Sequence, residues 1–142
     1  MCGIAGYFNP DQNYAENPKQ NFHTLSRMIN TMNHRGPDTY GHTIINSCCL
    51  AHTRLSIIDL ENGRQPMSYT KDGNTYYIVY NGEIYNYKEV KKTLLWKNYT
   101  FETNSDTEVI IAAFCHYGPG FVKELNGIFA IAIYDSMRNT LY

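Results

Sequence analysis

The sequence predicts an α+β domain in which antiparallel sheets have helices packed against their outer faces. The order of candidate elements along the chain is strand, helix, several strands, two helices and a strand. An Asp-Gly pair at 72–73 is typical of a hairpin turn, and a hairpin joins antiparallel strands. The 142 residues match one ordinary domain, and 43% hydrophobic against 18% charged residues is a globular composition.

The first third of the chain predicts a strand, a loop and a helix. The segment Gly3–Phe8 is typical of a short buried strand, and the polar segment 9–20 indicates a mobile loop. Apolar residues at helical spacing then predict a helix that ends near Asn33, because Gly36-Pro37 stops the pattern. The residues with this spacing are Phe22, Leu25, Met28, Ile29 and Met32.

The middle of the chain is predicted to be mostly sheet. Its β-branched and apolar residues indicate strands at 41–45 and 50–58. A hairpin is predicted from strands at 67–70 and 75–80, on either side of the Asp-Gly turn.

Two helices and a strand are predicted in the last third. Asn86 with Glu89 resembles a capping box for a helix that extends to about residue 97. Ser105 with Glu108 repeats that pattern, for a helix that a Gly-Pro pair closes after Tyr117. The next segment, Gly127–Asp135, is nearly all apolar and predicts a strand covered on both faces, followed by a turn and a strand that starts at Leu141.

The charge and the apolar runs exclude several classes of partner. Twelve basic and thirteen acidic side chains give a net charge of −1, which provides no attraction to nucleic acid or anionic lipid. The longest apolar run, 128–134, is far shorter than the ~20 residues of a membrane span. Because the first residues also lack the pattern of a secretory signal, we expect a cytoplasmic protein.

The cysteines, histidines and tyrosines predict neither a disulfide scaffold nor a metal site. Cys2, Cys48, Cys49 and Cys115 are irregularly spaced, and the adjacent pair would point to opposite faces of a strand. His34, His42, His52 and His116 have no Glu or Cys at metal-binding spacing, so we interpret them as structural. Tyrosines that we expect to pack in the sheet and helix are Tyr76, Tyr77, Tyr80, Tyr85 and Tyr87.

Cys2 is the first candidate for chemistry, because removal of Met1 would place a thiol and an α-amine on one residue. Unperturbed, the amine titrates near ~8 and the thiol near ~8.5, so the amine can accept the thiol proton directly or through a water. A frayed terminus is the ordinary explanation of a second residue, but the strand Gly3–Phe8 follows at once. The sequence therefore predicts a nucleophile and its base on the same residue.

Three further positions have both a structural and a functional explanation. Asn81-Gly82 follows a predicted strand and is typical of a turn, although a strand end also holds catalytic groups rigidly. Arg54 lies in an apolar stretch, where it could form a buried ion pair or bind a substrate carboxylate. Asp106 lies in the first turn of a helix, where an acid is favourable against the helix dipole. These residues alone leave both explanations open.

Six motifs follow one another along the chain: Met1-Cys2-Gly3-Ile4-Ala5-Gly6, His34-Arg35-Gly36-Pro37-Asp38, Arg54-Leu55-Ser56-Ile57-Ile58-Asp59, Gln65-Pro66, Tyr80-Asn81-Gly82-Glu83-Ile84-Tyr85-Asn86 and Ser105-Asp106-Thr107-Glu108. In this order they resemble class II glutamine amidotransferase domains, in the version found in glutamine-hydrolysing asparagine synthetases. The resemblance implies the N-terminal-nucleophile hydrolase fold, an αββα sandwich of two antiparallel sheets between helical layers.

The resemblance also implies a role for each matching position. The Cys2 thiolate would attack the side-chain amide of glutamine, with the Asn81 amide and the Gly82 N–H as the oxyanion hole. Arg54 would hold the α-carboxylate of glutamine, and Asp106 would hold its ammonium group. Further glutamine-contacting positions match Leu55, Ser56, Ile57, Ile58 and Glu83.

In that family the ammonia passes to a C-terminal synthetase domain, which activates aspartate with ATP and magnesium. The glutaminase domain itself is expected to need no cofactor or metal. The family continues with a further hairpin beyond the position of Tyr142, so we expect an N-terminal fragment whose partner is the synthetase domain of the full-length chain. Homodimer formation is left open.

Two other functions remain open at this stage. One is a regulatory or scaffold module that has the same fold but no catalysis, and the presence of Cys2, Arg54, Asn81, Gly82 and Asp106 together argues against it. The other is action on a different amide, or supply of ammonia to an acceptor other than aspartate.

Overall fold

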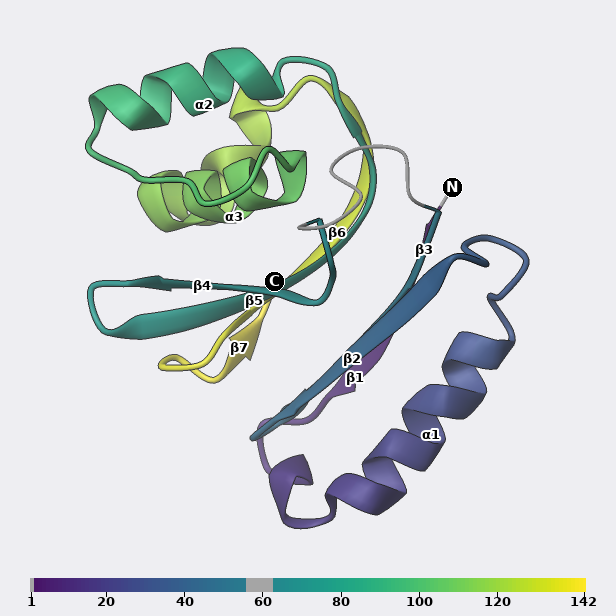
Figure 1. The fold of residues 1–142 in the computed structure, drawn as a ribbon. Coiled ribbons are helices and arrows are strands. Elements are labelled where there is room, and N and C mark those ends of the chain that lie inside the picture. Colours follow the sequence, from purple (N-terminus) through teal and green to yellow (C-terminus); the bar gives the residue numbers. More distant parts are fainter. Residues whose placement is uncertain (1, 56–62) are drawn as a thin grey trace.

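Two antiparallel sheets lie face to face between helices in a computed structural model, which describes residues 2–55 and 63–142 (Figure 1). The first sheet has the strand order β1-β3-β2 and consists of β1 (Gly3–Phe8), β2 (Thr39–Ile45) and β3 (Cys48–Arg54). The second has the order β4-β5-β6-β7 and consists of β4 (Met67–Lys71), β5 (Asn74–Ile84), β6 (Gly127–Asp135) and β7 (Thr140–Leu141). The helices of the domain are α1 (Pro18–Asn30), α2 (Tyr87–Trp96) and α3 (Asp106–Tyr117), with short 3-10 helices at Tyr14–Glu16 and Gly118–Glu124.

The helices cover the outer faces of the two sheets, α1 on the first and α2 with α3 on the second (Figure 1). Strand β3 shows how the sequence produces these layers, because it is buried along its whole length. Cys49 and Ala51 pack against Leu25 and Ile29 of α1. Their neighbours Cys48 and Leu50 pack against Val79 and Tyr134 of the second sheet. The predicted αββα sandwich and the opposite orientation of the two adjacent cysteines are therefore confirmed.

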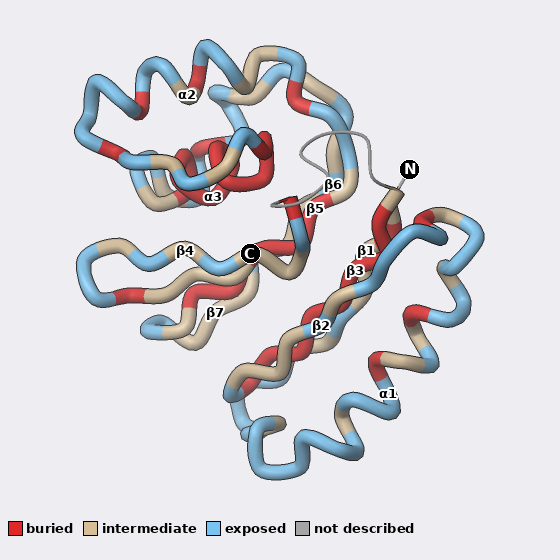
Figure 2. Tube along the Cα trace, viewed as in Figure 1, coloured by how far each residue is buried: buried red, intermediate tan, exposed pale blue. Residues whose placement is uncertain are grey.

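Helix α3 is the most buried of the helices that the structure describes, and its tube is largely red in Figure 2. It packs between α2, the second sheet and the 3-10 helix Gly118–Glu124. Its first residue, Asp106, is therefore held inside the molecule. As predicted, the helix extends to Tyr117 and ends at Gly118, whose φ of 65° an L side chain rarely adopts.

Strand β5 corrects the prediction that Asn81-Gly82 follows a strand. The strand continues to Ile84, and Asn81 and Gly82 pair with Ala130 and Phe129 of β6. The turn tendency of an Asn-Gly pair is overridden because β6 provides a full ladder of partners here. At Gly82 a Cβ atom would clash with the carbonyl oxygen of Ile128, so glycine is required for this close pairing.

The segment 9–20 is less open than the predicted mobile loop. Asn13 caps the short helix Tyr14–Glu16, and the Tyr14 N–H donates to the Asn46 carbonyl at 2.6 Å. Helix α1 begins at Pro18 and ends at Asn30, so it begins and ends earlier than the apolar spacing predicts. The early start has a local reason, because proline at the first helical position favours a helix start independently of the apolar pattern.

Neither predicted capping box forms, although both helices do. The Asn86 side chain donates to the Glu124 carbonyl at 2.9 Å and accepts from the Asn126 N–H at 2.8 Å, so it does not cap α2. Ser105 does cap α3, since its hydroxyl accepts from the Thr107 N–H at 3.2 Å. Glu108 instead accepts from the preceding loop at Glu102 and Thr103. Tertiary partners therefore replace the local contacts that the sequence pattern predicts.

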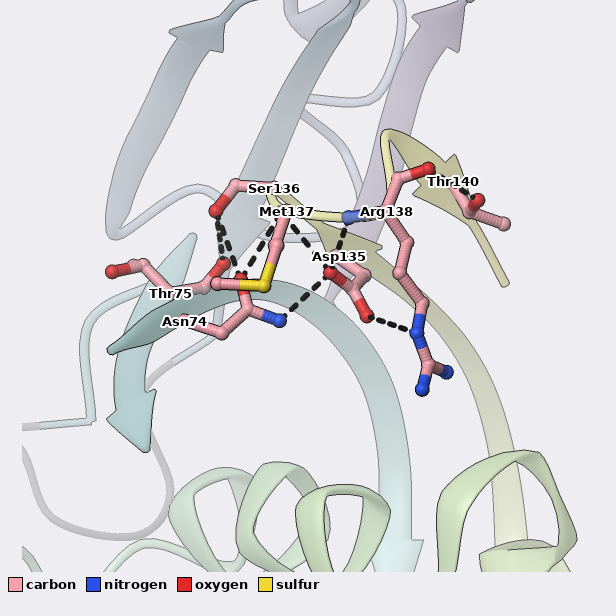
Figure 3. Close-up of polar contacts among 7 residues, drawn as sticks. All are labelled: Asn74, Thr75, Asp135, Ser136, Met137, Arg138 and Thr140. Carbon is pink, nitrogen blue, oxygen red and sulfur yellow. Dashed lines mark hydrogen bonds and ion pairs between the residues drawn. The ribbon is translucent and has the colours of Figure 1, made fainter. Parts of the chain in front are cut away.

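The β6–β7 hairpin forms at the predicted residues, and a buried aspartate fixes its turn (Figure 3). Asp135 accepts hydrogen bonds from Asn74 Nδ2 at 2.8 Å and from the backbone N–H groups of Met137 and Arg138. The other end of β6 is not covered on both faces as predicted, because Ile128 is 72% exposed. Among the described residues, no helix is long and apolar enough to cross a membrane.

Candidate active site

An open pocket of about 470 Å³ lies where β3, β5 and the start of α3 come together. It collects the predicted site residues that the structure describes, namely Cys2, Arg54, Leu55, Asn81, Gly82, Glu83 and Asp106. Ser56, Ile57 and Ile58 lie outside the described residues. The pocket wall also includes His52, Gln65, Tyr80 and Thr107. Its volume is in the range of small-molecule sites.

Cys2 reaches the pocket from the position just before β1. The register pairs Gly3 with Thr53, which places Cys2 beside the end of β3. Two contacts fix it there: the Arg35 Nε donates to the Cys2 carbonyl at 3.1 Å, and the Cys2 thiol donates to the Leu55 carbonyl at 3.8 Å. The thiol is thus half-buried and held by residues that are distant in sequence.

The His-Arg-Gly-Pro-Asp motif packs against the end of β3, next to Cys2. Pro37 forms an isolated parallel bridge with Arg54, and the Asp38 N–H donates to the Arg54 carbonyl at 3.1 Å. A Cβ atom at Gly36 would clash with the backbone of Thr53 and Arg54, so only glycine permits this close approach. Arg54 is 6% exposed as a result and still lines the pocket.

Asp106 lines the pocket from the first turn of α3, the helix that packs on the second sheet. The Tyr80 hydroxyl donates to Asp106 Oδ2 at 2.8 Å, and both side chains are buried. Burial raises the pKa of the Asp106 carboxyl, while the Tyr80 hydrogen bond and neighbouring backbone N–H groups oppose that rise. The pocket is therefore lined by a guanidinium from β3 and a carboxyl group from α3.

Several residues of the pocket wall are not among the predicted site residues, and three of them are His52, Gln65 and Tyr80. The sequence predicts a structural role for His52 and a packing role for Tyr80, and places Gln65 and Tyr80 in motifs without assigning either a role in the site. The missed signal for His52 is that it alternates with Arg54 on β3, so both side chains share a face. Burial lowers the pKa of His52 to about 4, a net value to which the Arg54 charge contributes and which a hydrogen bond with the Tyr80 backbone opposes. His52 is thus neutral at physiological pH.

The other tyrosines and histidines considered in the sequence analysis lie in different parts of the fold. Tyr76 and Tyr87 pack against the core of the second sheet, whereas Tyr85 is 57% exposed and lines the pocket. His42 stacks on Phe22 with ring centroids 4.7 Å apart. No three His, Cys, Asp or Glu side chains in ranges 2–55 and 63–142 are grouped to hold a metal ion.

An αββα sandwich with a cysteine just before its first strand, at a pocket between the two sheets, defines an N-terminal-nucleophile hydrolase fold. A solved structure titled as the allosteric regulatory enzyme of purine biosynthesis has the same fold, with a TM-score of 0.56 and 20% identity. The match covers 66% of this chain and 23% of that chain.

The chain belongs to the glutamine amidotransferase domain family, whose model matches residues 1–142. It is 39% identical over its whole length to the glutamine-hydrolysing asparagine synthetase 3 of Bacillus subtilis (strain 168), and covers 22% of that protein. It is 40% identical over 139 residues to the glutamine-hydrolysing asparagine synthetase B of Escherichia coli (strain K12), with 98% of this chain and 24% of that protein covered. The chain thus spans about a quarter or less of the length of these relatives.

Proposed function

We propose that this domain hydrolyses the side-chain amide of glutamine to glutamate and ammonia, with Cys2 as the nucleophile. The observation that supports the proposal is a single pocket lined by Cys2, Arg54, Asn81, Gly82 and Asp106. A thiol can form an acyl intermediate, and the opposite charges of Arg54 and Asp106 match the carboxylate and the ammonium of an α-amino acid.

Binding of glutamine uses the two oppositely charged residues that line the pocket. The Arg54 guanidinium takes the α-carboxylate of glutamine in a two-pronged contact, which its planar geometry favours. The Asp106 carboxylate takes the α-ammonium group, so the amino acid is held by its constant end and its side-chain amide extends toward Cys2. Leu55 and Glu83, and the residues 56–58 outside the described ranges, complete the proposed binding set.

Catalysis begins when the α-amine of Cys2, released by loss of Met1, accepts the thiol proton. The thiolate then forms a bond to the amide carbon, and the Asn81 amide and Gly82 N–H stabilise the oxyanion. The carbon–nitrogen bond breaks, the nitrogen takes the proton from the amine, and ammonia leaves. Water next attacks the γ-glutamyl thioester, which releases glutamate and restores the thiol.

The ammonia has a proposed destination beyond this domain. Because the relatives are about four to five times longer, we propose a C-terminal synthetase region that uses ATP and magnesium to convert aspartate to asparagine. In this arrangement the glutaminase domain needs no cofactor, and the synthetase region is its main partner. A cytoplasmic location and the formation of homodimers belong to the same proposal.

The test measures glutamate and ammonia released from glutamine, beside other primary amides, together with the intact mass of the chain. We expect activity to scale with the fraction of molecules that have lost Met1, and Cys2→Ala to abolish it while the melting temperature stays unchanged. Cys115→Ala is the matched control, because this half-buried thiol on α3 lies outside the pocket. Full activity in Cys2→Ala, or equal hydrolysis of other amides, would contradict the proposal.

A further inference from the structure

Tyr80 occupies a buried position on β5 where an apolar ring would pack equally well. Its ring belongs to the core between the second sheet and α3, beside residues such as Ile84 and Ile110. A buried hydroxyl costs free energy unless it is hydrogen-bonded, so phenylalanine would be the simpler choice for packing alone. The hydroxyl has one described partner, Asp106 Oδ2 at 2.8 Å. Tyrosine is therefore favoured over phenylalanine at this position only by the hydrogen bond to this carboxylate.

The backbone of Tyr80 is held toward the same helix by a second contact. The Tyr80 N–H donates to Gln65 Oε1 at 2.6 Å, and Gln65 Nε2 donates to Thr107 Oγ1 at 3.2 Å. Because β4 and β5 pair Met67 with Ile78, residue 65 lies opposite Tyr80, and the Gln65 side chain here continues the ladder. Both Tyr80 and Gln65 thus connect β5 to the first turn of α3.

This arrangement joins two parts of the pocket that come from different elements. Asp106 is fixed on α3, and Asn81-Gly82 follow Tyr80 directly in β5. Without a polar connection, their relative position would depend on apolar packing between a helix and a sheet, which has little directional preference. The Tyr80 hydroxyl supplies a directional link, and it remains a donor because burial raises the pKa of Tyr80.

We propose that Tyr80 is a positioning residue: its hydroxyl holds the Asp106 carboxylate, in its charged form, at the place where the ammonium group of the substrate binds. This inference rests on the proposed glutamine hydrolysis. It predicts an effect on substrate affinity and on the pH at which affinity is lost, beyond any effect on folding.

The decisive variant is Tyr80→Phe in the chain that has lost Met1. We expect the KM for glutamine to rise about tenfold with a smaller change in kcat, since a hydrogen bond to a charged group is lost. The acid limb of kcat/KM should move up by about one pH unit, because a carboxylate without this donor protonates more easily. The other titratable or charged groups facing Asp106 and Tyr80 are unchanged in this variant, namely Cys2, His52, Arg54 and Glu83.

Tyr77→Phe is the matched control, because Tyr77 lies on the same strand and packs against the opposite face. It should leave KM and the acid limb unchanged. Calorimetry of glutamine binding to Cys2→Ala measures affinity without turnover. Adding Tyr80→Phe to this variant should weaken the binding by the same factor by which it raises KM. An unchanged KM, acid limb and binding constant in an active, folded Tyr80→Phe would overturn the inference and leave the proposed function standing.

A different outcome would overturn the proposed function itself. If the processed parent releases no glutamate and Cys2→Ala does not bind glutamine, glutamine hydrolysis fails, and the role of Tyr80 fails with it. If Tyr80→Phe does not fold, Gln65→Met loosens the same connection without touching the ring. That variant should also raise KM, and an unchanged KM would again overturn the inference.

Discussion

Two residues of strand β5, Asn74 at its start and Tyr80 toward its other end, each donate to a buried aspartate, yet the two carboxylates have different surroundings. At the start of β5, Asn74 donates to Asp135, which is 1% exposed and also accepts two backbone N–H groups of its own turn (Figure 3). Further along β5, Tyr80 donates to Asp106, which is 8% exposed and lines a pocket. A buried aspartate enclosed within a turn, with no cavity beside it, is typical of structure, whereas a buried aspartate that lines a cavity is typical of a site.

This comparison predicts that substitutions at the two ends separate activity from stability. The largest effect is expected for Asn81→Ala at the pocket end. Loss of one oxyanion donor should lower kcat by about 100- to 1,000-fold, with little change in KM. The free energy of unfolding should change little, since Asn81 is only half-buried. Steady-state kinetics and denaturant unfolding on the same preparation check both parts, and a kcat within a few-fold of the parent would contradict the role.

Asp135→Ala at the turn end should have the opposite profile. Removing the carboxylate leaves the Met137 and Arg138 N–H groups and the Asn74 amide without their shared acceptor, so the free energy of unfolding should fall by about 2–3 kcal/mol. Molecules that remain folded should turn over glutamine at the parent rate. Thr140→Ala removes a hydroxyl of the same hairpin that donates only to the Arg138 carbonyl, and serves as a milder control. A large loss of kcat in folded Asp135→Ala would break the distinction.

The sequence predicts the architecture better than it predicts the site, and the reason is the range of the contacts involved. The β-branched and apolar residues of β3 and the Asp-Gly hairpin are local signals, and both elements form. Their bounds differ from the prediction, since β3 spans Cys48–Arg54 in place of 50–58 and β5 continues past residue 80 to Ile84. Asn81-Gly82 looked like a turn because the partner strand β6 lies almost fifty residues away, and local propensity contains no information about it. The predicted Asn86 cap is wrong for the same reason, since its partners Glu124 and Asn126 lie 38 and 40 residues away.

The residues of the pocket wall likewise depend on contacts between segments that are distant in sequence. Motif resemblance locates Cys2, Arg54 and Asp106, which the fold collects in one pocket. Tyr80 begins one of the motifs and His52 belongs to none, and neither is predicted to line the pocket, because a tyrosine or histidine in a strand is ordinary until its burial and its partner across the fold are known. A buried polar group in a pocket wall is therefore a property that only the assembled sheets reveal.

The smallest expected effect is a loss of stability at low pH. It tests whether the buried His52 in the pocket wall lowers the free energy of unfolding in acid. Burial holds the pKa of His52 at about 4, against about 6.5 in an unfolded chain. Between these values the unfolded chain binds a proton that the folded chain does not, so the free energy of unfolding falls as pH falls, by about 2 kcal/mol at pH 5 for this group. The raised pKa of Asp106 acts with the opposite sign, because the folded chain takes up that proton first.

The comparison to make is the difference in unfolding free energy between pH 7.5 and pH 5, in the parent and in His52→Gln. The substitution itself can change stability at both pH values, but only the titration of His52 changes the difference. We expect that difference to be about 2 kcal/mol smaller in His52→Gln. The same loss of acid sensitivity in Asp135→Ala would place its cause in the turn and not in the pocket. An NMR titration of the His52 ring checks the assignment directly, and a midpoint near 6.5 would refute it.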